Sequence, residues 1–310
     1  MTDKNMAPLG IFLRGMAMGA ADVVPGVSGG TIALISGIYD RLINAISSAD
    51  VELLGYLRKV EIVKAWQHVD ATFLLILLAG ILTSIATLAS IIISALATYP
   101  LLVWSFFFGL IFASAIFLMR QIKSWGWTNV LLLLVGVAIA VAVVFIKPVE
   151  SDGAPWYLFV AGAIAICATI LPGISGGFIL VLLGAYTPIL IAVKNFDIVP
   201  LASLMVGAGL GLLCFSKVLS WLLARFHNRV MALLTGFLLG SLYLVWPWKQ
   251  VMTWYTSSQG LQKPLVKENI SPLNYEMITG IDAQLLECVL AMIFGLVILF
   301  AMEKVANGNA

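Results

Sequence analysis

Long runs of apolar residues, separated by short polar segments, follow one another along this chain. A run of about 20 apolar residues is long enough to cross the roughly 30 Å hydrocarbon layer as a helix that rises about 1.5 Å per residue. Six runs therefore predict membrane-spanning helices at about 72–96, 100–119, 129–146, 199–223, 230–247 and 284–302.

Two further apolar regions are interrupted by the same short motif. DVVPGVSGGTIALISGIYD occupies residues 22–40, and TILPGISGGFILVLLGAYT occupies residues 169–187. Proline has no amide donor and clashes with the preceding helical turn, so neither region continues as one helix. We expect re-entrant helical hairpins at about 9–46 and 156–193 that leave the membrane on the face where they enter. Two full crossings stay an alternative for the second region, which is more apolar.

The two motif regions belong to an internal repeat. Residues 21–46 and 168–193 match at ten of 26 positions when aligned at an offset of 147. The offset then falls to 127, because only the first half carries the amphipathic insert at 50–70. At that second offset Gly80, Gly109 and Ser114 align with Gly207, Gly236 and Ser241.

Each half, 1–150 and 151–310, thus consists of one hairpin followed by three spans. Because three is odd, the two halves must have opposite orientations in the membrane, which is the plan of many secondary transporters. The predicted fold class is an all-α integral membrane protein with an inverted structural repeat. The insert at 50–70 mixes apolar and basic residues, as expected of a helix on the inner membrane surface.

Composition and charge agree with this arrangement. Apolar residues make up 62% of the chain, charged residues 10%, and the mean hydropathy is +1.07, which leaves too little polar surface for a water-soluble domain. If each hairpin crosses the membrane an even number of times, every arginine falls on the cytoplasmic side, as the positive-inside rule requires. Both termini are then cytoplasmic. The net charge of +2 gives no indication of a nucleic-acid partner.

The motifs offer chemistry for an anion. Irregular backbone at membrane depth is tolerated only where it is buried in protein or lines a wet cavity. Ser28-Gly29-Gly30 and Ser175-Gly176-Gly177 each precede an apolar helical run, so each places free amide donors and a hydroxyl at a helix start. Pro25, Gly26, Pro172 and Gly173 shape the hairpins. We expect the two starts to face each other as one phosphate cradle, although close helix packing is an alternative role for such small residues.

Charged residues near the motifs complete the candidate site. Arg14, Arg41 and Lys217 are candidate phosphate ligands, and Asp22 and Glu287 are candidates for ion coupling. Asp22 has no twin, because Thr169 occupies the matching position. Lys217 could instead reach toward the membrane surface, and Asp22 could cap the broken helix or neutralise Arg14. No catalytic residue, cofactor or metal site is expected, since the histidines and cysteines lack the spacing of metal ligands.

The pair PGVSGGT…GIYD and PGISGGF…GAYTPIL resembles the bacterial polyprenyl-phosphate (undecaprenyl-phosphate) translocase family over essentially the whole chain. This resemblance implies a flippase in the bacterial cytoplasmic membrane. Its substrate would be undecaprenyl phosphate, the lipid that carries cell-wall building blocks, returned from the outer to the inner leaflet for reuse. It also implies functional roles for the proline, glycine and serine positions of both motifs. Coupling to protons or sodium ions and assembly into a homo-oligomer stay open.

Two other functions compete with this interpretation. A transporter or channel for a small inorganic anion could use the same cradle. A lipid-pyrophosphate phosphatase is disfavoured, because such enzymes carry an arginine where this chain has Gly29 and Gly176, together with a glutamate-rich companion motif. Ser28 also has no evident general base, which nucleophilic catalysis by a serine requires.

Overall fold

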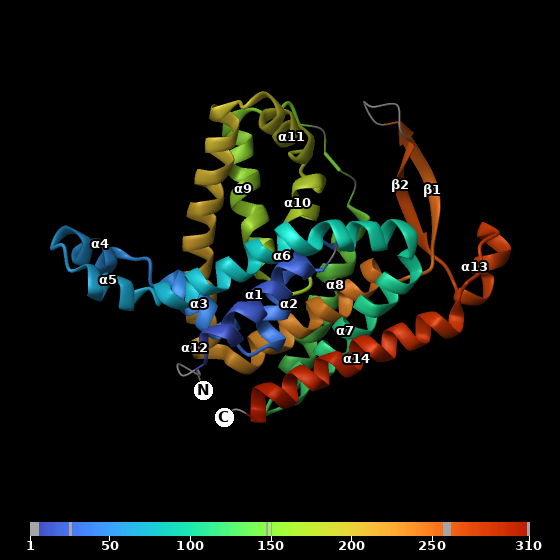
Figure 1. Ribbon diagram of the computed structural model, residues 1–310, viewed down its shortest axis with the longest axis horizontal. Coiled ribbons are helices and arrows are strands. Elements are labelled where there is room, and N and C mark those ends of the chain that lie inside the picture. Colours follow the sequence, from blue (N-terminus) through green and yellow to red (C-terminus); the bar gives the residue numbers. More distant parts are fainter. Residues whose placement is uncertain (1–5, 25–26, 147, 150, 257–261, 309–310) are drawn as a thin grey trace.

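The structure is a computed structural model that describes residues 6–24, 27–146, 148–149, 151–256 and 262–308. Figure 1 shows a mostly helical body, with a helical arm at one end and a two-stranded sheet toward the other. The elements are α1 Pro8–Asp22, α2 Gly29–Ile35, α3 Tyr39–Ser47, α4 Val51–Arg58, α5 Ile62–His68, α6 Ala71–Thr98, α7 Pro100–Gln121, α8 Trp127–Phe145, α9 Pro155–Ile170, α10 Gly176–Leu182, α11 Tyr186–Asn195, α12 Ile198–Val245, β1 Lys249–Thr256, β2 Gln262–Asn269, α13 Pro272–Thr279 and α14 Leu285–Gly308.

Four helices in the described part of the chain, α6, α7, α8 and α12, are long and apolar enough to cross a membrane. A fifth span results if α10 and α11, which meet at 101°, are counted together. Helix α12 has 48 residues but is interrupted at Phe226 (φ −130°, ψ 39°), so it covers two of the predicted runs. All six predicted runs lie on helices, and the prediction of a helical membrane protein is confirmed.

Glycines mark the crossing points between these helices. Helix α1 crosses α6 where a Cβ added to Gly15 would lie 3.1 Å from the Cα of Gly80. Helix α9 crosses α12 at Gly162 and Gly207, and a Cβ on Gly207 would overlap the carbonyl oxygen of Phe159. Without side chains at these positions the backbones approach closely, and van der Waals contact holds the helices together where no hydrophobic effect can.

The remaining long helices cross in the same way. Helix α8 meets α12 at Gly136 and Gly236, where a Cβ on either residue would lie 3.0 Å from the Cα of the other. Helix α7 meets α14 at Gly109 and Gly295, and a Cβ on Gly109 would overlap the carbonyl oxygen of Met292. Close glycine contacts therefore fix four of the helix pairs that build the body.

The two short helices that follow the motifs have different surroundings. All seven residues of α2 are buried, within a cluster formed with α1, α3, α6, α7 and the second part of α12. Only Gly176 and Leu182 are buried in α10. The first motif thus leads into the centre of the protein, whereas the second leads along its periphery.

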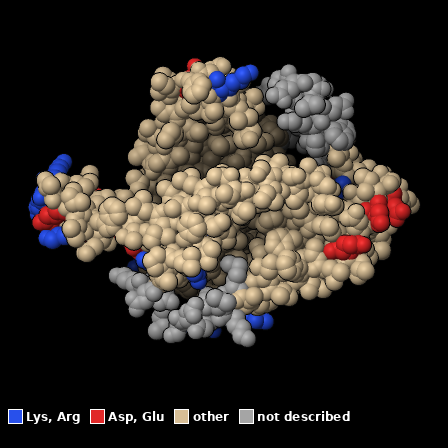
Figure 2. Space-filling view, in the orientation of Figure 1, with Lys and Arg blue, Asp and Glu red and all other residues tan. Residues whose placement is uncertain are grey.

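The predicted amphipathic insert at 50–70 forms two short helices, α4 and α5, in place of one. They are separated near Val60, whose φ of 57° breaks the helical path. Val51, Val63 and Trp66 are exposed on this arm beside basic residues such as Lys59. Figure 2 shows charged side chains over the arm and around α13, with a broad uncharged band between them.

The segment 248–283, for which the sequence pattern predicts no element, forms β1, β2 and α13. Strands β1 and β2 pair antiparallel, with Lys249 opposite Asn269. The indole nitrogen of Trp248 donates a hydrogen bond to the carbonyl oxygen of Ala283 at 2.9 Å, which ties this segment to the start of α14. A two-stranded sheet is therefore added to an otherwise helical fold.

The glycine crossings predict a contrast between two neighbouring positions of α12. Gly207→Ala should lower the free energy of unfolding by about 1–3 kcal/mol, because its Cβ has no room against the Phe159 carbonyl. At Gly209 an added Cβ would have no atom within 4 Å, so Gly209→Ala should leave the free energy of unfolding unchanged or raise it by about 0.5–1 kcal/mol. Thermal unfolding of the two purified variants measures this, and equal midpoints would contradict close packing at Gly207.

Candidate functional site

The first motif joins α1 to α2. Its Pro25 and Gly26 lie outside the described residues. Ser28 is 1% exposed and caps α2, because its hydroxyl oxygen accepts a hydrogen bond from the amide of Gly30 at 3.1 Å. Serine is a favoured N-cap because it satisfies an amide that the helix itself leaves unpaired. The predicted helix start at Ser28-Gly29-Gly30 is present.

The second motif joins α9 to α10 in a related way. Gly173 has a φ of +84°, and a Cβ there would lie 2.8 Å from the carbonyl oxygen of Phe237, so both conformation and space require glycine. Ser175 caps α10 and accepts a hydrogen bond from the amide of Phe178 at 3.5 Å. Pro172 and Gly173 are both buried.

The two motif regions touch each other. The Ser28 hydroxyl donates a hydrogen bond to the carbonyl oxygen of Thr169 at 3.1 Å, and the amide of Gly173 donates to the hydroxyl of Thr31 at 3.0 Å. The hydroxyl of Tyr39 donates to the carbonyl oxygen of Ile170, also at 3.1 Å. These three bonds satisfy polar groups where α9 ends, at which a helix leaves carbonyl oxygens unpaired. Residues more than 130 positions apart are thereby joined at the two breaks.

The first motif carries a carboxylate that the second lacks. The Oδ1 atom of Asp22 accepts a hydrogen bond from the amide of Gly29 at 2.6 Å. At the matching position, the hydroxyl of Thr169 donates to the carbonyl oxygen of Ala165 at 2.9 Å. A carboxyl group therefore occupies the start of α2, and among the described residues the matching position at the start of α10 carries a hydroxyl in its place.

Space at the two motifs differs in the same sense. A Cβ added to Gly30 would lie 2.7 Å from the carbonyl oxygen of Ile170. At the equivalent Gly177, which is exposed, a Cβ would meet only the hydroxyl of Ser175, at 3.8 Å. The two motifs therefore differ at their last glycine, where the second has free space and the first does not. At Gly176 the second motif is also closely packed, since a Cβ there would overlap the hydroxyl of Thr169.

The predicted basic ligands have protein partners. The Nε atom of Arg14 donates to the carbonyl oxygen of Ser36 at 3.1 Å, beyond the C-terminal end of α2, where a cation is favourable. The Nε atom of Arg41 donates to Oδ2 of Asp70 at 2.7 Å, and its guanidinium lies 4.4 Å from the ring centre of Phe73. The structure thus places the Arg14 side chain at the opposite end of α2 from Ser28. The side chain of Arg41, which belongs to α3, contacts the start of α6.

Lys217 and Glu287 lie on other elements. Lys217 is exposed on α12, directly after the buried Ser216. Glu287 is exposed in the first turn of α14, next to Cys288, which is buried in a small cluster with Trp248 and Tyr275. The structure therefore brings Asp22 and the two motifs together, and it places Glu287 on the exposed side of α14, away from the buried cluster that Cys288 joins.

Thr31, Tyr39 and Thr169 are contact residues that the sequence reasoning did not select. Tyr39 gave the one available signal, since it matches Tyr186 in the repeat. A hydroxyl hidden in a helical run, like that of Thr31, carries no pattern that reveals its partner.

One cluster of the described chain could present ligand atoms to a metal. Asp50, Glu52 and His68 bring such atoms within 4.8 Å of one another on the α4–α5 arm. The Asp50 carboxylate already accepts hydrogen bonds from the amides of Glu52 and Leu53 as the cap of α4. The bond from the Leu53 amide holds the pKa of this carboxyl below its ordinary value. Capping of α4 and the 3.2 Å contact between Asp50 Oδ1 and Nε2 of His68 account for the position of this carboxylate.

The fold defines a polytopic helical membrane protein in which two broken helical motifs touch. A family model described as undecaprenyl phosphate translocase-like matches residues 18–263. A protein of Vibrio cholerae serotype O1 named polyprenyl-phosphate transporter is 44% identical over 307 residues, covering 99% of this chain and all of the relative. A Staphylococcus aureus protein of the same name is 30% identical over 266 residues, covering 79% of this chain and 89% of the relative. No solved structure matches.

The chain belongs to the undecaprenyl phosphate translocase-like family. The resemblance seen in the two motifs is therefore confirmed. The names of the family and of both relatives are those of transporters, which decides against the phosphatase alternative.

The unequal motifs predict unequal responses at matching positions. Gly30→Ala should lower the free energy of unfolding by about 1–3 kcal/mol, because its Cβ presses on the Ile170 carbonyl where the motifs meet. Gly177→Ala should leave the unfolding temperature unchanged, since its Cβ finds open space. Thermal unfolding of both variants in the same detergent makes the comparison. A larger loss of stability for Gly177→Ala than for Gly30→Ala would contradict the close packing at Gly30 and the free space at Gly177.

Proposed function

We propose that this protein is a flippase that moves undecaprenyl phosphate across the bacterial cytoplasmic membrane and so returns the carrier lipid for cell-wall synthesis. The observation that carries the proposal is the contact between the two PGxSGG regions inside a helical body whose relatives are named polyprenyl-phosphate transporters. A lipid phosphate needs a polar site for its head group and an apolar route for its tail. Broken helices packed among apolar spans supply both.

The proposed mechanism is alternating access between two inverted repeats. The helix crossings support this, because Gly15 and Gly80 correspond to Gly162 and Gly207 at the offsets of 147 and 127. Gly109 likewise corresponds to Gly236, and each lies at a crossing. Near-equivalent halves can exchange conformations, which moves the opening of one site from one membrane face to the other.

The phosphate site in this conformation is assigned to the second motif. Gly177 borders open space at the start of α10, and the Ser175 hydroxyl lies 3.8 Å from the position that a Cβ on Gly177 would take. At the first motif the corresponding donors already have partners: the amide of Gly29 bonds Asp22, and the hydroxyl of Ser28 bonds the Thr169 carbonyl oxygen. A phosphate bound there would have to displace a carboxylate, so the two motifs would bind in turn.

The proposed orientation has both termini in the cytoplasm. Figure 1 shows the N and C ends of the chain near each other on one side of the body, with the β1–β2 sheet on the far side. The predicted topology places three basic residues near loops on the same side of the membrane as the termini: Arg120, Lys123 and Arg225. Short cytoplasmic loops collect such residues.

Reconstitution tests the proposed activity. Vesicles that contain the protein should move labelled undecaprenyl phosphate between leaflets faster than empty vesicles. Gly177→Trp should abolish this acceleration by filling the space at the second motif, whereas Gly209→Trp, at an equally open position of α12, should retain it. Ser175→Ala should weaken head-group binding by about tenfold, the loss expected for one hydrogen bond to a charged group.

Transport by Gly177→Trp at the wild-type rate would refute the motif site. No acceleration by the wild-type protein, together with uptake of inorganic phosphate, would redirect the assignment to the small-anion alternative.

Ion coupling is tested at Asp22. Protonation of this carboxylate would weaken the charge-assisted hydrogen bond to Gly29 and free the start of α2. Asp22→Asn should therefore flatten the dependence of transport on a proton or sodium gradient while transport along a lipid gradient continues. Asp152→Asn, in the exposed turn before α9, is the control. An unchanged gradient dependence in Asp22→Asn would exclude the coupling role.

A further inference from the structure

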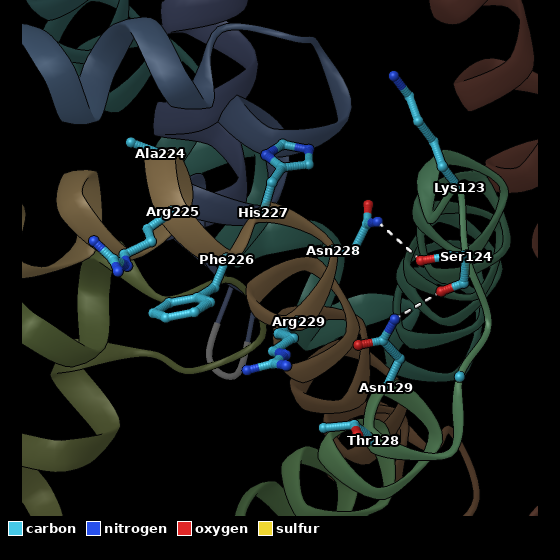
Figure 3. Close-up of a pocket in the computed structure, with 11 residues that line it drawn as sticks. Lys123, Ser124, Thr128, Asn129, Ala224, Arg225, Phe226, His227, Asn228 and Arg229 are labelled. Atoms are coloured by element: carbon cyan, nitrogen blue, oxygen red, sulfur yellow. Dashed lines mark hydrogen bonds between the residues drawn. The ribbon is translucent and has the colours of Figure 1, made fainter.

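The interruption of α12 at Phe226 borders a cavity. The chain leaves helical geometry at this residue, within the polar stretch Arg225-Phe226-His227-Asn228-Arg229. A cavity of about 690 Å³ lies between this break and the turn that joins α7 to α8 (Figure 3). None of the described residues of the two motifs is among those that line it.

One hydrogen bond joins the two walls of the cavity, and a second stabilises the wall formed by the α7–α8 turn. The Nδ2 atom of Asn228 donates to the hydroxyl of Ser124 at 3.2 Å, and Nδ2 of Asn129 donates to the Ser124 carbonyl oxygen at 2.7 Å. Figure 3 shows Ser124 between these two amides, with Lys123 beside it. The break in α12 is therefore fixed against the α7–α8 turn.

The walls carry positive charge. Lys123, Arg225 and Arg229 line the cavity, and no acidic residue is among the described residues that line it. The guanidinium groups of Arg225 and Arg229 lie 5.9 and 5.3 Å from the ring centre of Phe226. An anion that reaches this basic surface gains favourable Coulomb energy from these cations. Arginine also matches the geometry of phosphate oxygens.

The surface that leads to the cavity is apolar. Val218 and Trp221, on the part of α12 before the break, are 53% and 55% exposed. The Trp221 ring lies 5.9 Å from that of Phe226, so the apolar face reaches the cavity wall. A ligand with a phosphate head and an apolar tail fits both surfaces, whereas a soluble phosphate would use only one.

We infer that this cavity is a second phosphate site, which holds the head group of the polyprenyl phosphate lipid at the cytoplasmic surface while its tail lies along α12. The identity of the lipid rests on the proposed function. The site itself rests on the cavity, its charge and the neighbouring apolar face.

The experiment uses full-length protein in phosphatidylcholine nanodiscs and an undecaprenyl phosphate analogue with a photoreactive group near its head. Labelled peptides are identified by mass spectrometry. Arg225→Gln combined with Arg229→Gln should lower labelling of residues 218–230 by about tenfold and leave labelling near Ser175 unchanged. Arg58→Gln combined with Lys59→Gln removes the same charge from the α4–α5 arm and should have no effect.

Competition identifies the ligand chemistry. Unlabelled undecaprenyl phosphate should displace the probe, while undecaprenol and phosphatidylglycerol should not, and inorganic phosphate should do so only at far higher concentration. Equal labelling in the Arg225 and Arg229 double variant would overturn the site. If phosphatidylglycerol competes as well as undecaprenyl phosphate does, the surface binds anionic lipids in general. If inorganic phosphate competes as well, the site binds soluble anions. Either result overturns the assignment.

The two proposals fail separately. Lipid movement by the wild-type protein without labelling of 218–230 would refute the cavity site alone. Labelling of that segment without any lipid movement would refute the flippase and leave the cavity as a binding site.

Discussion

Backbone polar groups at membrane depth must find partners within the protein, and the contact between the two motif regions meets this constraint. Each motif ends one helix and starts another, which leaves amides and carbonyls unpaired at two places. Ser28 and Tyr39 donate to carbonyl oxygens at the end of α9, and Thr31 accepts from the amide of Gly173. Each break thus supplies partners for the other, and α2 is held at the centre of the body.

The glycine crossings allow the breaks to meet. Short helices cannot reach across a body whose spans are kept apart by bulky side chains. At Gly80 and Gly207 the backbones of crossing helices approach so closely that an added Cβ would overlap a carbonyl oxygen. This close approach brings α1 and α9, which lead into the two motifs, against α6 and α12. Packing at the spans and hydrogen bonding at the breaks therefore depend on each other.

Much of this was accessible from the sequence, because hydrophobic length and the positions of Pro and Gly act locally. The spans, the two breaks and the caps at Ser28 and Ser175 follow from such local rules. The partners did not follow, since no pattern links Thr31 to Gly173 across 142 positions. Arg41 shows the same limit: its position beside a motif indicated a ligand role, yet Asp70 and Phe73 are the partners that the fold provides.

The repeat is close in sequence but unequal in charge, and that inequality bears on the proposed mechanism. An ion gradient drives a carrier only where ion binding is linked to the exchange between its inward-open and outward-open states, so coupled transport needs an ion-binding group at the site. Asp22 is present only in the first half, where it bonds Gly29, while Thr169 turns back to its own helix. In the proposed mechanism, a conformation that frees the start of α2 would break the hydrogen bond between Gly29 and Asp22 and expose this carboxylate, which has no counterpart at the start of α10. An ion that binds Asp22 would therefore bias the exchange between the halves, which is the thermodynamic requirement for coupled transport.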